Sequence, residues 1–332
     1  MNIFYALVAV ILLMSIPVIG VSGLRWNSLF GVVVPYLALG TFVAGIIYRV
    51  LKWGSAPVPF HIPTVCGQQK SLPWIKPSRI DSPFTTRGVI ARLALEVLCF
   101  RSLFWNERVE LKKAYQLLYR RNLYLWLGGL VFHWSLFVIL FRHLRLFAEP
   151  VPSLVLLTQT LDGILQNLFP LIYVTDFFIV AALFYLTLRR LRDSQLRYLS
   201  LPSDYFALFL LLGVVSSGLL MLLVFKVDLV KAKGLMVKLF AFQPVNPEGM
   251  GLIFYIHLFL ASVLIAYFPF SKLMHMAGVF LSPTRNLKND SRMVRHINPW
   301  NNKDKVKIHT YEEYEDEFRQ SMKEAGIPVE KE

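Results

Sequence analysis

Four histidines lie inside long apolar segments of the chain, where an ionisable side chain is costly unless it has a partner or a function. His133 and His143 lie on one segment, ten residues apart, and His257 and His275 lie on another, eighteen residues apart. Imidazole is a common metal ligand in proteins. Two pairs on two apolar segments therefore predict bound metal.

Helix geometry predicts how the four histidines combine. Eighteen residues make five full turns, so His257 and His275 would project from one face of a continuous helix, about 27 Å apart along its axis. His133 and His143, ten residues apart, would differ by about 80° around the helix and by about 15 Å along it. Because they do not share one face as His257 and His275 do, a helix tilt or a kink would have to align the two pairs. Pro269 is a candidate for such a kink. Antiparallel helices would pair His133 with His275 and His143 with His257, and each pair could hold one iron axially.

Small residues lie one helical turn from these histidines, as a flat macrocycle against a helix would require. They are Gly129, Ala261 and Ser271, and another segment adds Gly213, Ser216, Ser217 and Gly218. Close packing of membrane helices also favours small residues.

The cysteine content limits which metal cofactors the chain could bind. Only Cys66 and Cys99 occur, and neither lies in a Cys-x-x-Cys-His motif, so covalent c-type haem is excluded. Two cysteines cannot ligate a four-thiolate iron–sulfur cluster. Two non-covalent haems b with bis-histidine iron remain, which carry electrons because neither axial position is open. Cys66 is interpreted as a structural thiol.

The composition indicates an all-α, multi-pass bundle in the cell membrane. The chain has 332 residues, is 55% hydrophobic and has a mean hydropathy of +0.51, and about 20 apolar residues suffice to span a bilayer. Six transmembrane segments are predicted at Ile3–Val21, Ser28–Leu51, Leu123–Arg142, Gln166–Leu188, Tyr205–Val227 and Gly251–Met274. The first is read as a helix rather than a signal peptide, because no positive charge precedes it.

The basic residues orient this bundle. Twelve Lys and Arg lie between Lys52 and Arg121, four between Arg189 and Arg197, and eleven from Lys272 onward. The positive-inside rule then places both termini in the cytoplasm. The third helix would run outward and the sixth inward, with the two haems held between them. The net charge of +14 thus reflects topology, and no nucleic-acid partner is predicted.

Four regions follow from these segments. Residues 1–51 form a two-helix membrane hairpin, residues 52–121 a cytoplasmic connection, residues 122–281 a four-helix dihaem domain and residues 282–332 a polar cytoplasmic tail. The connection contains an amphipathic stretch at Gly88–Phe104, which could lie on the membrane surface. The tail could dock on a partner subunit or remain solvated.

Three further polar residues are candidate site residues. Asp176, expected near the middle of the fourth span, could relay protons from a quinol or simply bond Thr175 or a neighbouring helix. Arg142 and Arg145 could pair with haem propionates or snorkel to the interface. His61, His296 and His309 lie in polar segments and are interpreted as surface histidines.

Two motifs carry a resemblance to a known family. The ligand spacings and the run Pro269-Phe270-Ser271-Lys272-Leu273-Met274-His275 resemble the membrane cytochrome b (gamma) subunits of respiratory nitrate reductase. The flanks Cys66–Ile75 and Asn286–Trp300 resemble more narrowly the DsrM-type cytochrome b subunits of complexes linked to dissimilatory sulfite reduction.

The resemblance implies a function that the residues alone do not name. Such subunits use two haems b to oxidise menaquinol and to pass electrons to a cytoplasmic iron–sulfur subunit related to heterodisulfide reductase, within a larger membrane oxidoreductase complex. The outer side, with Glu149, Asp162, Asp228 and Glu248, is where quinol would be oxidised.

Three other functions remain as alternatives. They are a proton-coupled transporter, a nitrate reductase-type cytochrome b of another complex, and an anchor without a cofactor. A proton relay gives no reason for the eighteen-residue spacing, and an anchor leaves all four histidines unexplained.

Overall fold

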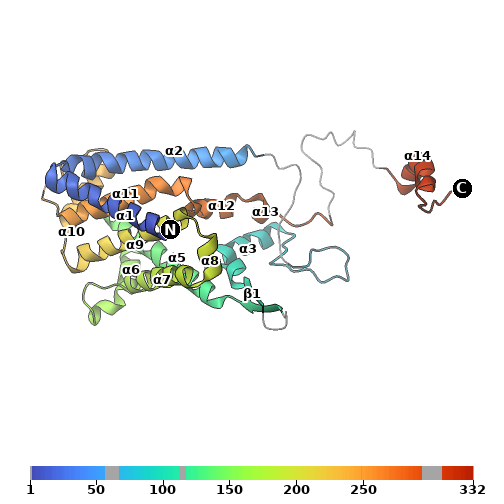
Figure 1. Cartoon of the computed structure of the whole chain (residues 1–332), viewed down its shortest axis with the longest axis horizontal. Coiled ribbons are helices and arrows are strands. Elements are labelled where there is room, and N and C mark those ends of the chain that lie inside the picture. Colours follow the sequence, from blue (N-terminus) through green and yellow to red (C-terminus); the bar gives the residue numbers. More distant parts are fainter. Residues whose placement is uncertain (1, 57–66, 112–116, 248, 294–308, 332) are drawn as a thin grey trace. The chain divides into compact units, whose positions relative to one another are not determined.

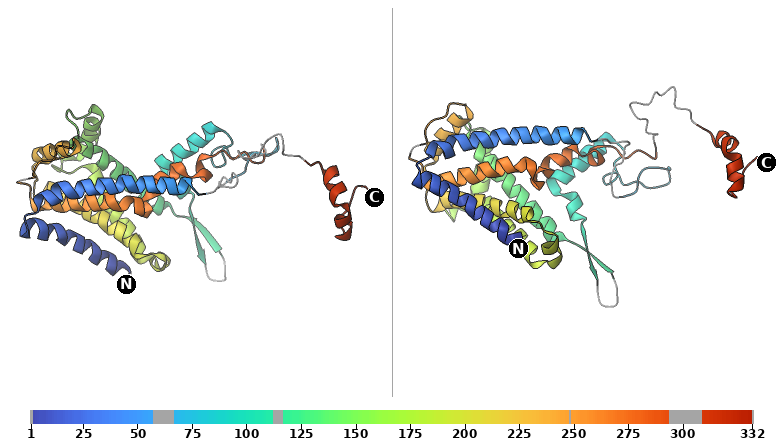
Figure 2. Two further views of the ribbon diagram at one scale, coloured as in Figure 1. Left: turned by 90° about the horizontal axis from the view of Figure 1, so that it is seen from above. Right: turned by 45° about the horizontal axis from the view of Figure 1, so that its top comes forward.

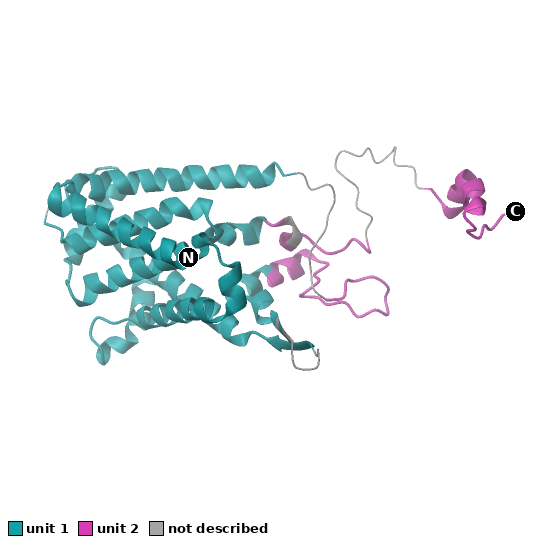
Figure 3. Cartoon of the chain, in the orientation of Figure 1, with its two compact units in different colours: residues 1–56, 93–281 teal, residues 57–92, 282–332 magenta. Residues whose placement is uncertain are grey.

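The computed structural model describes residues 2–56, 67–111, 117–247, 249–293 and 309–331 (Figure 1). The chain forms two compact units (Figure 3). The large unit comprises Met1–Ala56 and Leu93–Leu281, and the small unit comprises Pro57–Arg92 and Ser282–Glu332. The sites of Cys66, His61, Glu248 and His296 fall outside the described residues.

Six long helices build the large unit, and each satisfies its backbone hydrogen bonds internally, as lipid requires. They are α1 (Asn2–Pro17), α2 (Val34–Gly54), α5 (Leu123–His143), α7 (Val174–Arg192), α9 (Pro202–Leu223) and α11 (Leu252–Tyr267). Short π or 3-10 turns extend them: η1 (Val18–Gly23), η2 (Leu29–Val33), η3 (Leu144–Leu146) and η5 (Phe268–Phe270). Helix α5 packs along α7, α9 packs along α1 and α11, and α11 also packs along α2.

Within the described residues, five helices are long and apolar enough to cross a membrane. They cover Asn2–Gly23, Leu29–Gly54, Leu123–Leu146, Pro202–Leu223 and Leu252–Phe270. The predicted segment Gln166–Leu188 is not among them. That region contains α6 (Ser153–Asp162) and the 3-10 turn η4 (Gly163–Asn167), and only then does α7 begin.

The charged ends of α7 explain this difference. Asp176 lies in its first turn, where Oδ2 accepts a hydrogen bond of 3.3 Å from the Tyr173 backbone N–H, and three arginines lie in its last turn. The expectation that Asp176 lies mid-helix was wrong, because a capping carboxylate belongs at a helix N-terminus.

Side-chain contacts define two ends of the large unit, here called the Asp204 end and the Arg142 end. At the Asp204 end, Asn2 Nδ2 donates to Ser200 O over 2.9 Å; Ser200 follows the short helix α8 (Ser194–Leu199). At the Arg142 end, Tyr36 Oη donates to Leu239 O over 2.7 Å. Leu239 lies in the short helix α10 (Leu229–Phe240). Successive long helices alternate in direction between these ends (Figures 1 and 2).

The structure is mostly helical, as predicted, and its described residues form one two-stranded sheet, in the connection between α2 and α5. Helix α3 (Thr86–Cys99) is followed by Phe100, whose φ of +49° is left-handed, and then by the short helix α4 (Arg101–Phe104). Strands β1 (Glu107–Leu111) and β2 (Leu117–Arg121) then pair antiparallel, with Glu107 opposite Arg121. Arg121 lies over the Trp105 ring, 4.0 Å from its centroid, a cation–π contact that fixes the base of the hairpin.

In the small unit, hydrogen bonds connect the segment before α3 to the segment after α12. Asn289 is buried; its Nδ2 donates to Ser82 Oγ and its backbone N–H donates to Pro83 O, both over 2.7 Å. Gln69 Nε2 donates to Ser291 Oγ over 2.8 Å. The large unit ends in η6 (Lys272–Met274) and α12 (His275–Leu281), and the small unit continues in α13 (Pro283–Asn286).

The tail contains an ordered helix, α14 (Tyr311–Glu324), with a capping box between Thr310 and Glu313. Glu315 is buried on this helix at 2% exposure. Its two oxygens accept hydrogen bonds from the backbone N–H groups of Glu330 and Lys331, over 2.8 and 2.9 Å. One carboxylate therefore folds the last residues back onto the helix.

This closure is expected to depend on pH. The two backbone donors stabilise the charged form and hold the pKa of Glu315 below its ordinary value. A lowered folded-state pKa contributes stability that is complete above the ordinary glutamate pKa and is lost as the pH falls through the folded-state value. Amide exchange at Glu330 and Lys331 should accelerate in acid, and in Glu315→Gln at every pH. Slow exchange of both amides in Glu315→Gln would contradict this account.

Candidate haem-binding site

All four histidines of the apolar segments have Nδ1 bonded to backbone carbonyls. His133 and His143 both lie on α5, and their Nδ1 atoms lie 2.7 Å from Gly129 O and Ile139 O, one turn earlier. A carbonyl oxygen only accepts, so each Nδ1 must carry the proton. The lone pair of each neutral ring then lies on Nε2, which is free to bind a metal.

His257 is supported by another helix. It lies on α11, and its Nδ1 is 3.1 Å from Val214 O and 3.0 Å from Ser217 Oγ, both on α9. Ser217 is buried at 1% exposure. A Cβ on Gly218 would approach His257 Cε1 to 3.2 Å, so this glycine admits the imidazole.

His275 lies outside α11, contrary to the continuous helix expected from residue 251 to 274. Helix α11 ends at Tyr267, and η5 and η6 separate it from α12, which begins at His275. The interruption occurs at Pro269, the predicted kink. His275 Nδ1 is 2.8 Å from Lys272 O, so its orientation depends on this turn.

The fold brings the histidines together as two pairs. The ring centroids of His133 and His275 are 5.9 Å apart, with the ring planes at 88°. His143 is the last residue of α5, and His257 lies in the second turn of α11. The first pair belongs to the Asp204 end and the second to the Arg142 end, and ten residues of α5 separate them by about 15 Å.

This donor set fits bis-histidine iron. Two metal–imidazole bonds of about 2.0 Å, each added to about 1.2 Å from nitrogen to ring centre, would place the centroids about 6.4 Å apart, close to the separation of His133 and His275. Within the described residues, no group of three or more His, Cys, Asp or Glu could hold a metal. None of the four rings is fully buried, and those of His143 and His275 are exposed.

The glycines among the small residues make room for neighbouring side chains. A Cβ on Gly129 would lie 3.2 Å from Leu103 of α4, and a Cβ on Gly213 would lie 3.3 Å from Leu260. The contact of Gly129 with His133 is the hydrogen bond that its carbonyl oxygen accepts from Nδ1. Sequence reasoning missed Phe100, whose ring centroid lies 4.8 Å from that of His133; its left-handed backbone, which the sequence does not signal, places it there.

Arg142 is buried at the centre of an ion cluster beside His143. Its Nη2 is 2.9 Å from Asp176 Oδ1, and its Nε is 3.0 Å from Asp162 Oδ2. The Tyr173 ring lies 3.7 Å from the guanidinium carbon. Arg145 instead donates from Nη1 to Gln159 Oε1 over 2.9 Å. The charge of Arg142 is thus already balanced by two carboxylates.

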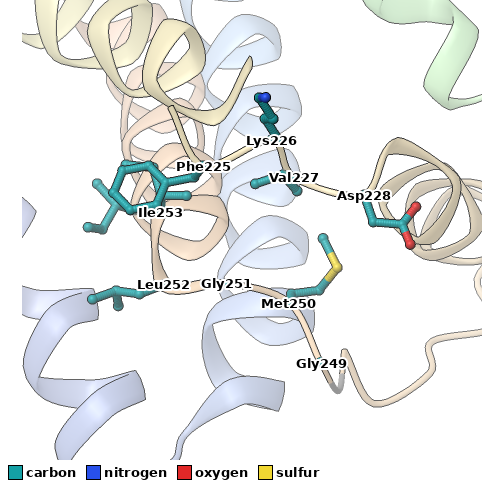
Figure 4. Close-up of a pocket in the computed structure, with 10 residues that line it drawn as sticks. Phe225, Lys226, Val227, Asp228, Gly249, Met250, Gly251, Leu252 and Ile253 are labelled. Carbon is teal, nitrogen blue, oxygen red and sulfur yellow. The ribbon is translucent and has the colours of Figure 1, made fainter. Parts of the chain in front are cut away.

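An open cavity of about 370 Å³ lies at the Arg142 end, between the loop after α9 and the start of α11 (Figure 4). Its lining is mainly apolar and includes Met250 and Ile256, the residue before His257. Asp228 also lines it, and accepts hydrogen bonds from the N–H groups of Val230 and Lys231. Glu149 is paired with Lys233 nearby.

These features define a multi-pass membrane protein with paired histidines in its helix bundle. Residues 95–296 match the nitrate reductase gamma subunit family, and the chain belongs to that family.

Two curated relatives carry the name Hdr-like menaquinol oxidoreductase cytochrome b-like subunit. One, from Archaeoglobus fulgidus, is 47% identical over 279 residues, covering 82% of this chain and 83% of the relative. The other, from Archaeoglobus profundus, is 40% identical over 273 residues, covering 80% and 81%. The predicted membership of the nitrate reductase gamma-like family and the predicted membrane location are confirmed.

Proposed function

We propose that the chain is the dihaem b subunit of a menaquinol oxidoreductase, with His133 and His275 holding one haem and His143 and His257 the other. The observation that carries the proposal is the shared state of the four imidazoles, each with Nδ1 bonded to a carbonyl and Nε2 free. When bound, haem b supplies reversible one-electron transfer. The protein would hold the two pairs of imidazoles at two different depths of the helix bundle.

We also propose that α7 is a sixth span and that both termini are cytoplasmic. Nineteen residues rise about 28 Å, close to the thickness of the hydrocarbon core. Helix α7 starts beside Arg142 and ends beside Asp204, since Arg190 Nη1 lies 3.7 Å from Asp204 Oδ2. The basic segments then share the Asp204 end, which the positive-inside rule makes cytoplasmic.

Menaquinol would enter the cavity at the Arg142 end. Its apolar lining suits a quinone ring, and Asp228 is a proton acceptor on its wall. Asp176 and Asp162 form a buried carboxylate pair around Arg142, so one of them could also relay a proton. A quinone analogue bound beside His133 and His275 instead would place quinol oxidation at the other end.

The partner would be a cytoplasmic iron–sulfur subunit of the heterodisulfide reductase type. The relatives' shared name supports this choice. The likeness of the flanks Cys66–Ile75 and Asn286–Trp300 to DsrM-type subunits supports a role in dissimilatory sulfur metabolism.

The reduced absorption spectrum of the purified chain tests the function. Dithionite should produce b-type bands, with two haems per polypeptide. A proton-coupled transporter or a cofactor-free anchor would show no such bands. Absence of the bands would therefore overturn the proposal. A nitrate reductase-type subunit of another complex would show the same bands but would purify with a different partner.

His257→Ala should separate electron entry from assembly. Without this imidazole, the haem at the Arg142 end loses a ligand, so quinol should no longer reduce the protein while dithionite still reduces the remaining haem. The cytoplasmic segments lie about 30 Å away, so the iron–sulfur partner should still copurify. Unchanged reduction by quinol would exclude entry at the Arg142 end, and loss of the partner would mean that this haem is needed for assembly.

A further inference from the structure

The backbone that carries His275 is the least regular of the four ligand segments. Ser271 is extended, with ψ of 177°, between the single turns η5 and η6. Its Oγ accepts from Leu273 N over 3.1 Å and donates to Phe268 O over 2.9 Å. A continuous helix therefore cannot set the position of His275, and another contact must hold this turn.

Arg49 Nε of α2 donates to Pro269 O over 2.8 Å, and Lys272 provides a second contact, closer to His275. Its carbonyl oxygen accepts the His275 Nδ1–H bond of 2.8 Å, and its Nζ donates to Asp204 Oδ1 over 2.7 Å. One residue thus orients the imidazole through its backbone and anchors the turn through its side chain. The bond to Asp204 joins two charged groups and is short, as strong charge-assisted hydrogen bonds are.

Asp204 is a rigid anchor because it is fixed from three directions. Its side chain is only 9% exposed. The second oxygen accepts from Leu201 N over 3.0 Å at the start of α9, and lies 3.7 Å from Arg190 Nη1 at the end of α7. Arg190 in turn donates to Ser200 Oγ over 2.8 Å. The carboxylate is therefore tied to two long helices of the bundle.

We infer that Asp204 is a positioning residue for the haem ligand His275, acting through Lys272. The inference rests on the proposed function, since it concerns a ligand of the haem at the Asp204 end. Partners of a ligating imidazole fix its orientation and its basicity. His133 and His143 receive this support from their own helix, and His257 receives it from α9. His275 depends instead on an ion pair between distant segments.

Carbon monoxide binding tests this role in the full-length protein. Bis-histidine iron has no open position and does not bind carbon monoxide. Lys272→Met keeps the aliphatic stem of an exposed side chain and removes its charge. We expect one of the two haems in this variant to bind carbon monoxide after reduction, and the affinity for that haem to fall by up to about 5-fold, as the loss of an ion pair with an exposed lysine allows.

Asp204→Asn should give the same spectrum, because its amide oxygen can still accept from Leu201 N while the ion pair is lost. Lys272→Arg, which keeps the charge, should resemble the parent. Lys331→Met is the matched control: it removes an ion pair with Glu312 in the small unit and should bind no carbon monoxide.

Two results would overturn the inference in distinguishable ways. If the parent holds two haems and both Lys272→Met and Asp204→Asn exclude carbon monoxide, the positioning role is wrong and the proposed function stands. If the parent holds no haem, the proposed function fails and the inference fails with it. Should Lys272→Met not accumulate, Asp204→Asn carries the same comparison.

Discussion

Replacing either His133 or His275 by alanine is expected to abolish the same haem and to leave the other in place. The two ring centroids are 5.9 Å apart, and under the proposed function both imidazoles bind one iron. Each variant should retain about half of the parent's haem, and redox titration should show one surviving centre with the same midpoint potential in both. This loss is complete for one cofactor because bis-histidine binding needs both imidazoles.

His309→Ala provides the control for that pair. His309 is exposed and lies in the small unit, where its Nδ1 is 3.9 Å from Glu313. Both haems should remain in this variant. Different surviving centres in His133→Ala and His275→Ala would refute the pairing.

Arg142→Ala is expected to give the largest loss of stability. The side chains of Asp162 and Asp176 are only 5% and 12% exposed, so removing the guanidinium leaves two carboxylates buried without their cation. Breaking a buried ion pair in this way costs about 3–5 kcal/mol. The midpoint of thermal unfolding in detergent should fall markedly.

Two further variants locate the source of that loss. Arg145→Ala removes a hydrogen bond to the neutral Gln159 and should cost about 1 kcal/mol. Arg142→Lys keeps the charge but cannot reproduce the planar fork that reaches both carboxylates, so its stability should be intermediate. Equal unfolding midpoints for Arg142→Ala and Arg145→Ala would show that the ion cluster does not hold this end of the bundle.

Local composition alone predicted much of the architecture. Five of the predicted segments agree with the apolar spans of the structure to within four residues at each end, because a chain in lipid has few alternatives to the helix. The histidine spacing on α5 follows from the same regularity, since ten residues of one unbroken helix have only one geometry. The family was also predicted, from short motifs that need no tertiary information.

Tertiary structure decided the features that depend on residues far apart in the chain. Helix α7 begins at Val174 because Asp176 caps it and meets Arg142, 34 residues earlier. His275 leaves the axis of α11, and its turn is held by Asp204, 68 residues before Lys272. The carbonyl and hydroxyl that orient His257 come from α9, some 40 residues away. Periodicity describes one helix at a time, whereas buried charges and imidazoles take their partners from whichever helix the fold places beside them.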